Sequence, residues 1–281
     1  MNISIVIPAK NESEGLKSFL PELRSNYPDS EIIVVDDGST DETLDICRQN
    51  EVKVKSHPYS MGNGAAIKTG ARSATGDVIV FMDADGQHKP KDIAELLVGI
   101  EDGFDLVVGA RSSKSQASFG RSIANKFYNK LSSFVVNHKI DDLTSGFRAV
   151  KRIKFIEFLH LLPNGFSYPT TSTMAFFRAG YSVKYVPIEA EKRIGKSHIK
   201  IFRDGFRFLL IIFKICTLYS PLKLFVPISA ILFFTGFLYY IYTFITAGRF
   251  TNMSATIILS SVIIFLIGLV SEHISVLTYK K

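Results

Sequence analysis

Short apolar runs, rich in β-branched residues, recur along the first part of the chain and are separated by segments of helical length. In chain order the runs are ISIVIPA, EIIVVDD, VKVKSH, DVIVFMD and DLVVGAR. Runs of this length and character are typical of strands that are buried on both faces of a parallel sheet. The alternation therefore predicts β-α-β units, an α/β fold class and a mostly parallel sheet.

The residues also mark where two of the helices start. Ser39 and Glu42 have the spacing of a capping box, which predicts that Ser39 caps the helix that follows the second strand. Pro90 suits the first turn of a helix that we expect to end near Glu101.

The pattern is softer after residue 112. It predicts a helix over residues 119–136, a turn at DDLTSGFRAV, a helix over 153–162 and a strand at YSVKYVPIEA. Residues 200–221 then mix basic and apolar positions, as in a helix that lies along a membrane surface.

Two long uncharged runs follow, residues 224–248 and 250–271, on either side of Arg249. About 20 apolar residues allow a helix to cross a bilayer core, so the pair predicts a transmembrane hairpin. Two buried helices of a soluble core are a weaker alternative, because neither run offers a polar face. Basic residues crowd before the first run and Lys280 and Lys281 close the chain, which predicts that both termini are cytoplasmic.

The net charge of +7 is concentrated in one stretch of the chain. Residues 1–191 carry 22 Lys and Arg against 24 Asp and Glu, whereas residues 192–223 carry eight basic residues against Asp204 alone. A basic belt directly before two apolar runs favours anionic lipid headgroups as its partner, and we expect no nucleic-acid binding.

Cysteine content and the start of the chain add two limits. The two cysteines, Cys47 and Cys216, suggest neither a disulfide framework nor a cysteine metal site. MNISIVIPAK enters a strand pattern directly, without a basic and apolar leader. We therefore predict an integral membrane protein with a cytosolic domain over residues 1–199, an amphipathic interfacial region over 200–221 and two transmembrane helices over 222–281.

Candidate chemistry gathers where the predicted strands end. Asp83 and Asp85 follow the fourth strand one residue apart and would repel each other unless a cation lay between them. In sheets of this type, ligands collect at the carboxyl ends of the strands. A divalent cation is therefore the simplest prediction, and an Asp-rich turn is the weaker alternative. Gly62, Gly64 and Gly70 lack the Walker and Rossmann spacings, so we expect them to serve close helix packing.

Several motifs together give the chain a resemblance. They are VIPAKNE, VVDDGSTDET, GNGAAIKTG, FMDADGQH, GAR, DLTSGFRAV and RIGKSHIK, in that order. The chain resembles the family 2 glycosyltransferases of the GT-A fold, and among them the polyprenyl-phosphate branch of dolichyl-phosphate mannose synthases and undecaprenyl-phosphate glucosyltransferases. The resemblance covers essentially the whole chain and implies a GT-A catalytic domain with a transmembrane α-hairpin.

The resemblance implies a donor site at the strand ends. Asp83, Asp85 and Gln87 would bind Mg²⁺ or Mn²⁺, with Ala84 between the carboxylates, and through the metal the diphosphate of a nucleotide sugar. The nucleoside pocket would consist of Pro8, Ala9, Glu12, Asp36 and Asp37. Asp37 would contact the base or ribose, and Asp36 has a helix-capping role as its alternative.

The resemblance also implies residues for the acceptor and for the diphosphate. Arg111 and Arg121 would face the acceptor phosphate, because a planar guanidinium matches a phosphate monoester. A solvated helix face is the alternative for Arg121. The segment with Arg193, Lys196, Ser197 and Lys200 would grip the donor diphosphate as a mobile loop, and attraction to lipid headgroups is its alternative.

A phosphate acceptor needs no dedicated base, since its second pKa is about 6 and it is largely dianionic at neutral pH. Asp141 and Asp142 remain open as a base or as positioning residues. Catalysis would rest on alignment and on stabilisation of the departing nucleoside diphosphate by the metal.

The function expected from this resemblance is inverting transfer of one sugar from a nucleotide sugar to a polyprenyl phosphate at the cytoplasmic membrane face. UDP-sugars such as UDP-glucose are favoured, and GDP-mannose is the alternative donor. A processive polysaccharide synthase is disfavoured, because such enzymes use a Gln-x-x-Arg-Trp acceptor motif and more transmembrane helices, and this chain has no tryptophan. A silent sugar-nucleotide-binding scaffold is disfavoured because Arg111 and the metal carboxylates are present. A homo-oligomer is compatible with these expectations.

Overall fold

The chain is described by a computed structural model. The structure describes residues 1–111, 119–165, 167–189, 210, 213–214, 216–217 and 220–278. It divides into two compact units, Met1–Ile211 and Ile212–Lys281. Most of the predicted interfacial segment 200–221 lies outside the described residues, as do Lys280 and Lys281. The three-part division of the chain therefore stays a prediction.

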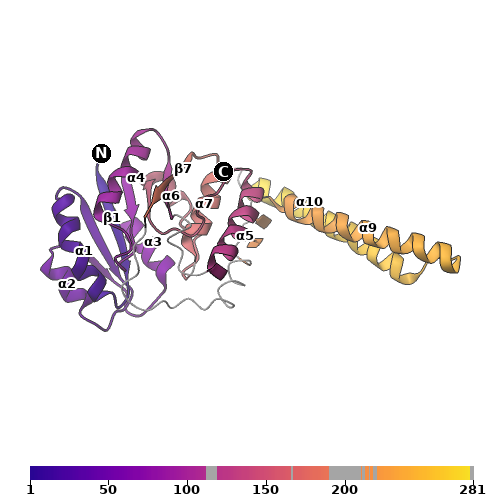
Figure 1. Cartoon of the computed structure of the whole chain (residues 1–281), viewed down its shortest axis with the longest axis horizontal. Coiled ribbons are helices and arrows are strands. Elements are labelled where there is room, and N and C mark those ends of the chain that lie inside the picture. Colours follow the sequence, from indigo (N-terminus) through magenta and orange to yellow (C-terminus); the bar gives the residue numbers. More distant parts are fainter. Residues whose placement is uncertain are drawn as a thin grey trace. The chain divides into compact units, whose positions relative to one another are not determined.

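The first unit is built on a seven-stranded sheet with the order β3-β2-β1-β4-β6-β5-β7. Figure 1 labels β1 and β7 of this sheet among the helices of the unit. The strands are β1 (Ile3–Ala9), β2 (Glu31–Asp36), β3 (Lys53–Ser56), β4 (Val78–Phe81), β5 (Leu106–Arg111), β6 (Arg148–Lys151) and β7 (Val183–Ile188). Neighbouring strands are parallel except at β6, which runs antiparallel to both β4 and β5. The predicted α/β class and mostly parallel sheet are confirmed.

Helices cover both faces of the sheet. They are α1 (Ser13–Asn26), α2 (Thr43–Gln49), α3 (Asn63–Ser73), the 3₁₀ turn η1 (Pro90–Asp92), α4 (Ile93–Glu101), α5 (Phe119–Val136), α6 (Arg152–Glu157) and α7 (Tyr168–Arg178). One face packs a buried apolar cluster against α1, α2 and α4. On the other face Phe81 contacts Phe155 of α6 and Tyr168 of α7, with ring centroids 4.8 and 5.8 Å away. The sheet is thus buried on both sides, as continuous apolar strands require.

Gly70 shows why α3 can lie close to the sheet. A Cβ at this position would come within 2.2 Å of Cγ1 of Val6 and 3.2 Å of Cγ2 of Val35. A methyl group would therefore push the helix away from β1 and β2. The predicted packing role of this glycine is confirmed.

Three predictions about local structure were wrong. Ser39 caps no helix: α2 begins at Thr43, whose amide bonds Oδ1 of Asp41 at 3.1 Å, and Ser39 Oγ instead accepts the amide of Asn11. The predicted helix over 153–162 is α6, which ends at Glu157. The expected turn DDLTSGFRAV contains strand β6, which was missed because a strand of four residues leaves little periodicity to detect.

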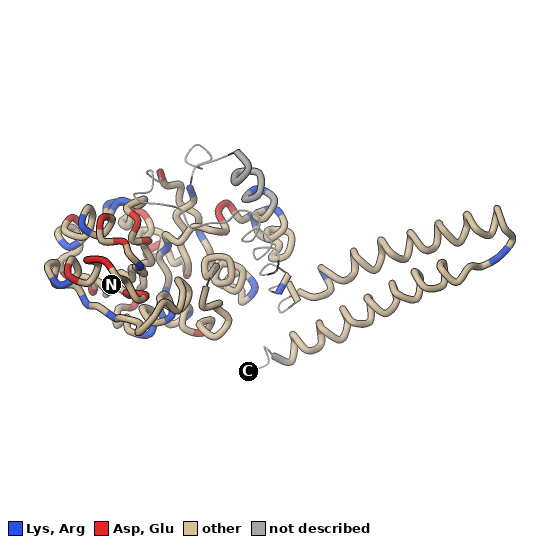
Figure 2. The backbone as a smooth tube through the Cα atoms, turned by 90° about the horizontal axis from the view of Figure 1, so that it is seen from below, with Lys and Arg blue, Asp and Glu red and all other residues tan. Residues whose placement is uncertain are grey.

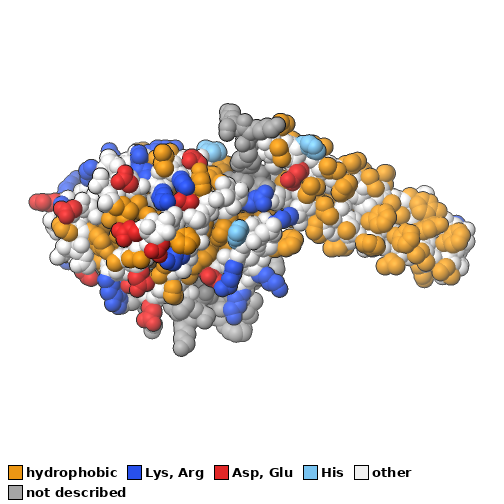
Figure 3. All heavy atoms as spheres, turned by 90° about the horizontal axis from the view of Figure 1, so that it is seen from above, with side chains coloured by type: hydrophobic (Ala, Val, Ile, Leu, Met, Phe, Trp, Pro, Cys, Tyr) orange, Lys and Arg blue, Asp and Glu red, His pale blue; other side chains and the backbone are white. Residues whose placement is uncertain are grey.

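The second unit is a hairpin of α9 (Pro221–Ala247) and α10 (Asn252–Thr278). Both helices are long and apolar enough to cross a membrane by length and composition. Figure 2 shows charged residues only near the ends of this hairpin, and Figure 3 shows its visible face covered by hydrophobic side chains. Gly248 ends α9 in the left-handed conformation, with φ of 62°. The hairpin predicted from the two apolar runs is present.

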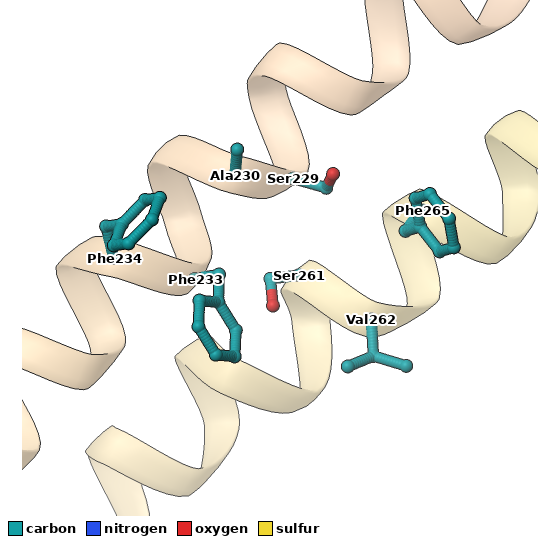
Figure 4. Close-up of a pocket in the computed structure, with 7 residues that line it drawn as sticks. All are labelled: Ser229, Ala230, Phe233, Phe234, Ser261, Val262 and Phe265. Atoms are coloured by element: carbon teal, nitrogen blue, oxygen red, sulfur yellow. The ribbon is translucent and has the colours of Figure 1, made fainter.

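Small residues let the two hairpin helices approach each other. A Cβ at Gly236 would come within 2.9 Å of Ile258 and 3.0 Å of Ile257. An open groove of about 260 Å³ between the helices is lined by Ser229, Ala230, Phe233, Phe234, Ser261, Val262 and Phe265 (Figure 4). The Ser229 and Ser261 hydroxyls each donate to a carbonyl of their own helix, so both serine donors are satisfied without a partner from outside.

Candidate active site

The chemistry-bearing residues predicted from the sequence collect at one edge of the sheet. β1, β2, β4 and β5 end there at Ala9, Asp36, Phe81 and Arg111. Because β6 is antiparallel, it begins at this edge, where Arg148 pairs with Phe81 of β4. β3 and β7 are parallel to their neighbours, so the edge is formed by six strand ends and one strand start.

The loops after β1 and β2 are tied to each other. The Asp37 amide donates to the Ala9 carbonyl at 2.8 Å, and the Thr40 amide donates to the Asn11 side chain at 2.8 Å. The Glu12 amide donates to Thr43 Oγ1 at 3.2 Å. Asn11 itself adopts a left-handed conformation, with φ of 53°. The structure thus brings together the two segments that carry the predicted nucleoside pocket.

Asp36 and Asp37 have different surroundings in that pocket, although both are buried. The carboxylate of Asp36 accepts the Ser39 amide at 2.9 Å. Asp37 accepts four hydrogen bonds, two at each oxygen, from His57 Nδ1, Ser60 Oγ and the amides of Met61 and Gly62. Burial alone would raise the pKa of Asp37, but these hydrogen bonds hold it below its ordinary value. Asp37 therefore anchors the loop of residues 57–62 beside the pocket.

The N-terminus of α3 is covered by main chain. The Gly64 amide donates to the Gly165 carbonyl at 3.2 Å, and the Ala65 amide donates to the Asn164 carbonyl at 2.8 Å. A Cβ at Gly64 would lie 2.0 Å from the carbonyl oxygen of Pro163. These two amide donors therefore have partners within the protein.

The carboxylate motif after β4 is held from two sides. Asp85 is buried, and its Oδ1 accepts the Gln87 amide at 3.2 Å. A Cβ at Gly15 of α1 would lie only 2.1 Å from the carbonyl oxygen of Ala84. On the other side, a Cβ at Gly146 would lie 2.8 Å from Oδ2 of Asp83. Two glycines therefore let α1 and the segment before β6 contact the motif directly.

The donor set fits a hard divalent cation. Asp83, Asp85 and Gln87 offer carboxylate and amide oxygens, the ligands that Mg²⁺ and Mn²⁺ prefer. In the described part of the chain, no group of three or more His, Cys, Asp or Glu side chains forms a metal cage. Two carboxylates suffice for an ion that shares phosphate oxygens and waters with its substrate.

His88 is the last residue of the motif FMDADGQH. Its ring stacks on Phe147 with centroids 4.6 Å apart and an interplanar angle of 10°. His88 is 5% exposed, and its Nδ1 has no hydrogen-bond partner among the residues that the structure describes. Burial lowers the pKa of His88 to about 4, so the ring is neutral near pH 7. A neutral, stacked imidazole is a packing element that fixes the end of the motif.

Arg111 is bound to Asp142 at the end of β5. Its Nε lies 2.8 Å from Oδ2 and its Nη2 lies 3.1 Å from Oδ1, and Nη2 also donates to Thr144 Oγ1 at 2.6 Å. Burial alone would raise the pKa of Asp142, but the Arg111 hydrogen bonds and charge hold it below its ordinary value. Asp142 is therefore a poor proton acceptor in this arrangement. Asp141 is exposed and pairs with Lys139 at 2.7 Å.

The remaining predicted contacts lie outside what the structure describes. Arg121 lies in α5, but its side chain is not among the described ones. Arg193, Lys196, Ser197 and Lys200 also fall outside the described residues. Their roles stay predictions.

Sequence reasoning missed the residues that support the motif from β6. Gly146 lies against Asp83, and Phe147 stacks on His88. Arg148 donates to the Ser145 carbonyl in the turn before β6. A polar and glycine-containing stretch directly before the apolar pair Ala149 and Val150 was the available signal, but it was taken for a turn.

Two family models match the chain. Residues 4–159 match the model described as Glycosyl transferase family 2, and residues 220–277 match the GtrB C-terminal hairpin. The putative glycosyltransferase CsbB of Bacillus subtilis is 28% identical, over 99% of this chain and 88% of that protein.

Further relatives match a part of the chain. The polyprenol monophosphomannose synthase of Mycolicibacterium smegmatis is 31% identical, over 69% of this chain and 79% of its own. The dolichol-phosphate mannosyltransferase of Pyrococcus furiosus is 34% identical, over 59% of this chain and 50% of its own. Glucosyl-3-phosphoglycerate synthase from Mycobacterium tuberculosis, solved with Mn²⁺ and UDP, superimposes with a TM-score of 0.62 at 23% identity, over 76% of this chain and 80% of its own. This last similarity shows a shared fold.

Proposed function

The chain belongs to glycosyl transferase family 2, and we propose that it is a membrane-anchored enzyme that transfers one sugar from a nucleotide sugar to a polyprenyl phosphate. The observation that carries this proposal is the single sheet edge at which Asp36, the Asp83 and Asp85 motif and Arg111 meet. One relative is named a polyprenol monophosphomannose synthase and another a dolichol-phosphate mannosyltransferase, and both names support this acceptor class.

The donor would occupy the part of the edge formed by β1, β2 and β4. The tied loops around Ala9 and Asp36 would hold the nucleoside, with Pro8 and Glu12 beside them. Asp83 and Asp85, with Gln87, would hold Mg²⁺ or Mn²⁺, which would supply positive charge to the departing nucleoside diphosphate. A UDP-sugar is the favoured donor and GDP-mannose is the second candidate, which the names of the mannose-transferring relatives support.

The acceptor phosphate would approach from the side of Arg111. A phosphate oxygen would form a bond to the anomeric carbon while the bond from that carbon to the nucleoside diphosphate breaks, which inverts the configuration. A monoester that is largely dianionic near pH 7 gives up no proton in this step. The depressed pKa of Asp142 fits a reaction without a general base. Asp142 would orient Arg111 instead.

The hairpin suits an acceptor whose isoprenoid stays in the bilayer. α9 and α10 would anchor the enzyme where that lipid lies, which raises the local concentration of one for the other. We propose that the catalytic unit and both termini lie on the cytoplasmic side, where basic residues before α9 would meet anionic headgroups.

A turnover assay tests this function. The full chain in detergent or vesicles is given polyprenyl phosphate and, in separate reactions, labelled UDP-glucose or GDP-mannose with Mg²⁺, with Mn²⁺ or with EDTA. We expect a labelled glycolipid from one donor, its loss in EDTA, and a fall of at least about 100-fold in Asp85→Ala. Equal product from the wild type and Asp85→Ala, or none from any nucleotide sugar, would contradict the proposal.

A further inference from the structure

The segment that enters β6 contacts the carboxylate motif through consecutive residues. Gly146 lies against the Asp83 carboxylate: a Cβ added to this glycine would be 2.8 Å from Oδ2 and 3.1 Å from Oδ1 of Asp83. Phe147 stacks on His88 at the other end of the motif. Both contacts arise because β6 is antiparallel and begins at the edge where β4 ends. The placement of this segment therefore affects both ends of the motif.

A hydrogen bond to α7 fixes Gly146. The Tyr168 hydroxyl donates to the Gly146 carbonyl at 2.8 Å, and Tyr168 is itself buried against Phe81. With its carbonyl held in this way, Gly146 resists moving back when a side chain is added to it. The Asp83 carboxylate would have to move instead.

Arg148 holds the same segment from beneath. It has no exposed surface and is the largest fully buried side chain of the described chain. Its Nη2 donates to the Ser145 carbonyl, and its Nη1 donates to Ser172 Oγ at 2.8 Å and to Thr173 Oγ1 at 3.1 Å. The guanidinium thus joins the turn before β6 to the first turns of α7.

The partners of Arg148 are neutral oxygens. Among the described residues, no carboxylate lies within ion-pair distance of this guanidinium. Burial lowers the pKa of Arg148, whereas Tyr168 and Tyr185 and, at longer range, Asp142 and Asp83 raise it. An arginine stays protonated in proteins. A buried charge without a carboxylate partner is costly, so a favourable interaction with nearby acids offsets part of that cost.

We propose that Arg148 is a positioning residue for the metal carboxylates. It holds Ser145–Phe147 so that Gly146 backs Asp83, and its buried positive charge attracts the Asp83 carboxylate. The inference rests on the proposed metal-dependent transfer and names the residues that prepare its metal site. Groups behind metal ligands usually change metal affinity or activity by about 10 to 100-fold when they are altered.

Binding of Mn²⁺ alone tests the inference without turnover. The full chain in detergent is titrated with Mn²⁺, and free ion is followed by electron paramagnetic resonance. Gly146→Ala adds the Cβ that meets Asp83, and Gly165→Ala is the matched control, since a Cβ at Gly165 has no described atom within 4 Å. We expect Mn²⁺ affinity to fall about tenfold or more in Gly146→Ala and to be unchanged in Gly165→Ala.

Two variants of Arg148 separate its charge from its geometry. Arg148→Lys keeps the charge and loses the planar fork, whereas Arg148→Met keeps apolar bulk and loses both. We expect Mn²⁺ affinity to fall in the order wild type, Arg148→Lys, Arg148→Met. In turnover, we expect a raised apparent KM for Mn²⁺ in Gly146→Ala and Arg148→Lys, with a smaller change in kcat at saturating metal.

The results distinguish failure of this inference from failure of the proposed function. If Gly146→Ala and Arg148→Lys lower Tm but bind Mn²⁺ as the wild type does, the segment is a core element and the inference is overturned. Should Arg148→Met fail to fold, the other two variants still decide. If the wild type turns over donor without binding Mn²⁺, the inference fails and metal dependence fails with it. If the wild type binds Mn²⁺ but transfers no sugar, the proposed function fails while the binding series still tests the inference.

Discussion

Arg111 and Asp142 form a two-point ion pair at the end of β5, with Nε 2.8 Å from Oδ2 and Nη2 3.1 Å from Oδ1. The fork of the guanidinium is thus used inside the protein. Nη1 makes no hydrogen bond to a described residue, so a phosphate could bind there or displace the carboxylate. Either route depends on the orientation that Asp142 gives to Arg111.

Arg111→Lys should specifically weaken use of the acceptor. Lysine keeps the charge but cannot hold Asp142 at two points or present a planar donor to phosphate. We expect kcat/KM for the lipid phosphate to fall about 100-fold, with the KM for the nucleotide sugar changed less than threefold. Steady-state kinetics with each substrate varied in turn measure both values. An equal rise in both KM values would show that Arg111 does not act on the acceptor.

Asp142→Asn tests whether this residue is a base. The amide keeps the shape of the carboxylate and an acceptor for Thr144, but it loses the charge that holds Arg111. We expect about a tenfold loss of kcat and an unchanged acidic limb of the pH profile, as for a positioning residue. Loss of that limb together with a fall of about 1000-fold would instead identify Asp142 as the base.

Gly15→Ala should distort the metal motif from the side of α1. Its Cβ would lie 2.1 Å from the backbone carbonyl of Ala84, which cannot rotate away. We expect a loss of about 3 kcal/mol in unfolding free energy, at the upper end for overpacking, and a weakened response to Mg²⁺. Thermal unfolding compares it with Glu14→Ala at an exposed position of the same helix. Wild-type Tm in Gly15→Ala would contradict the close contact.

Glu31 should make stability depend on pH at acidic values. Burial alone would raise its pKa, but hydrogen bonds from Lys53, Ser4 and Thr75 lower the pKa of Glu31 to about 2 from an ordinary 4.5. A lowered folded pKa means that the stabilisation is full above about pH 4.5 and is lost as pH falls toward 2.

We therefore expect Glu31→Gln to have a lower Tm than wild type at pH 7, by about 3 °C for each kcal/mol of unfolding free energy lost. The difference in Tm between the two proteins should become smaller as pH falls from 4.5 to 3. Glu22→Gln, exposed on α1, is the control. A constant difference between Glu31→Gln and wild type across this range would refute the assignment.

The stability of the hairpin should depend on the carboxylate of Glu272. Oε2 of Glu272 in α10 accepts the Leu222 amide at the start of α9, at 3.3 Å. A carboxylate at a helix N-terminus is stabilising by about 1 kcal/mol. We expect Glu272→Ala to increase proteolysis at this end of the hairpin in vesicles, and Glu272→Gln to do so less. Identical digestion of all three proteins would exclude a capping role.

The sequence predicted those parts of the fold that depend on periodicity and strand ends. The early strands, α5 and the hairpin follow from runs long enough to show a pattern. The carboxyl ends of parallel strands lie at one edge of a sheet, so the predicted strand ends place Asp36, Asp83, Asp85 and Arg111 together at that edge.

Tertiary contacts decided what the sequence could not predict. The contact of Asp37 with the nucleotide stays a prediction, but its internal partners were missed: both of its oxygens accept hydrogen bonds from the loop of residues 57–62, which the sequence does not mark as its partner. The pairing of Arg111 with Asp142 spans 31 residues and depends on β6, a strand too short to detect. Arg148 received no separate prediction, because nothing in the sequence shows that α7 would bury it.

The position of β6 has a consequence for how such an enzyme could change. In the sheet, β6 lies between two groups of strands: β3-β2-β1-β4, which would receive the donor, and β5-β7, which carries Arg111. Within the described sheet, the two groups are joined by hydrogen bonds to β6. Acceptor preference could therefore diverge while nucleotide preference is inherited, provided that the four residues of β6 and the turn before it are retained.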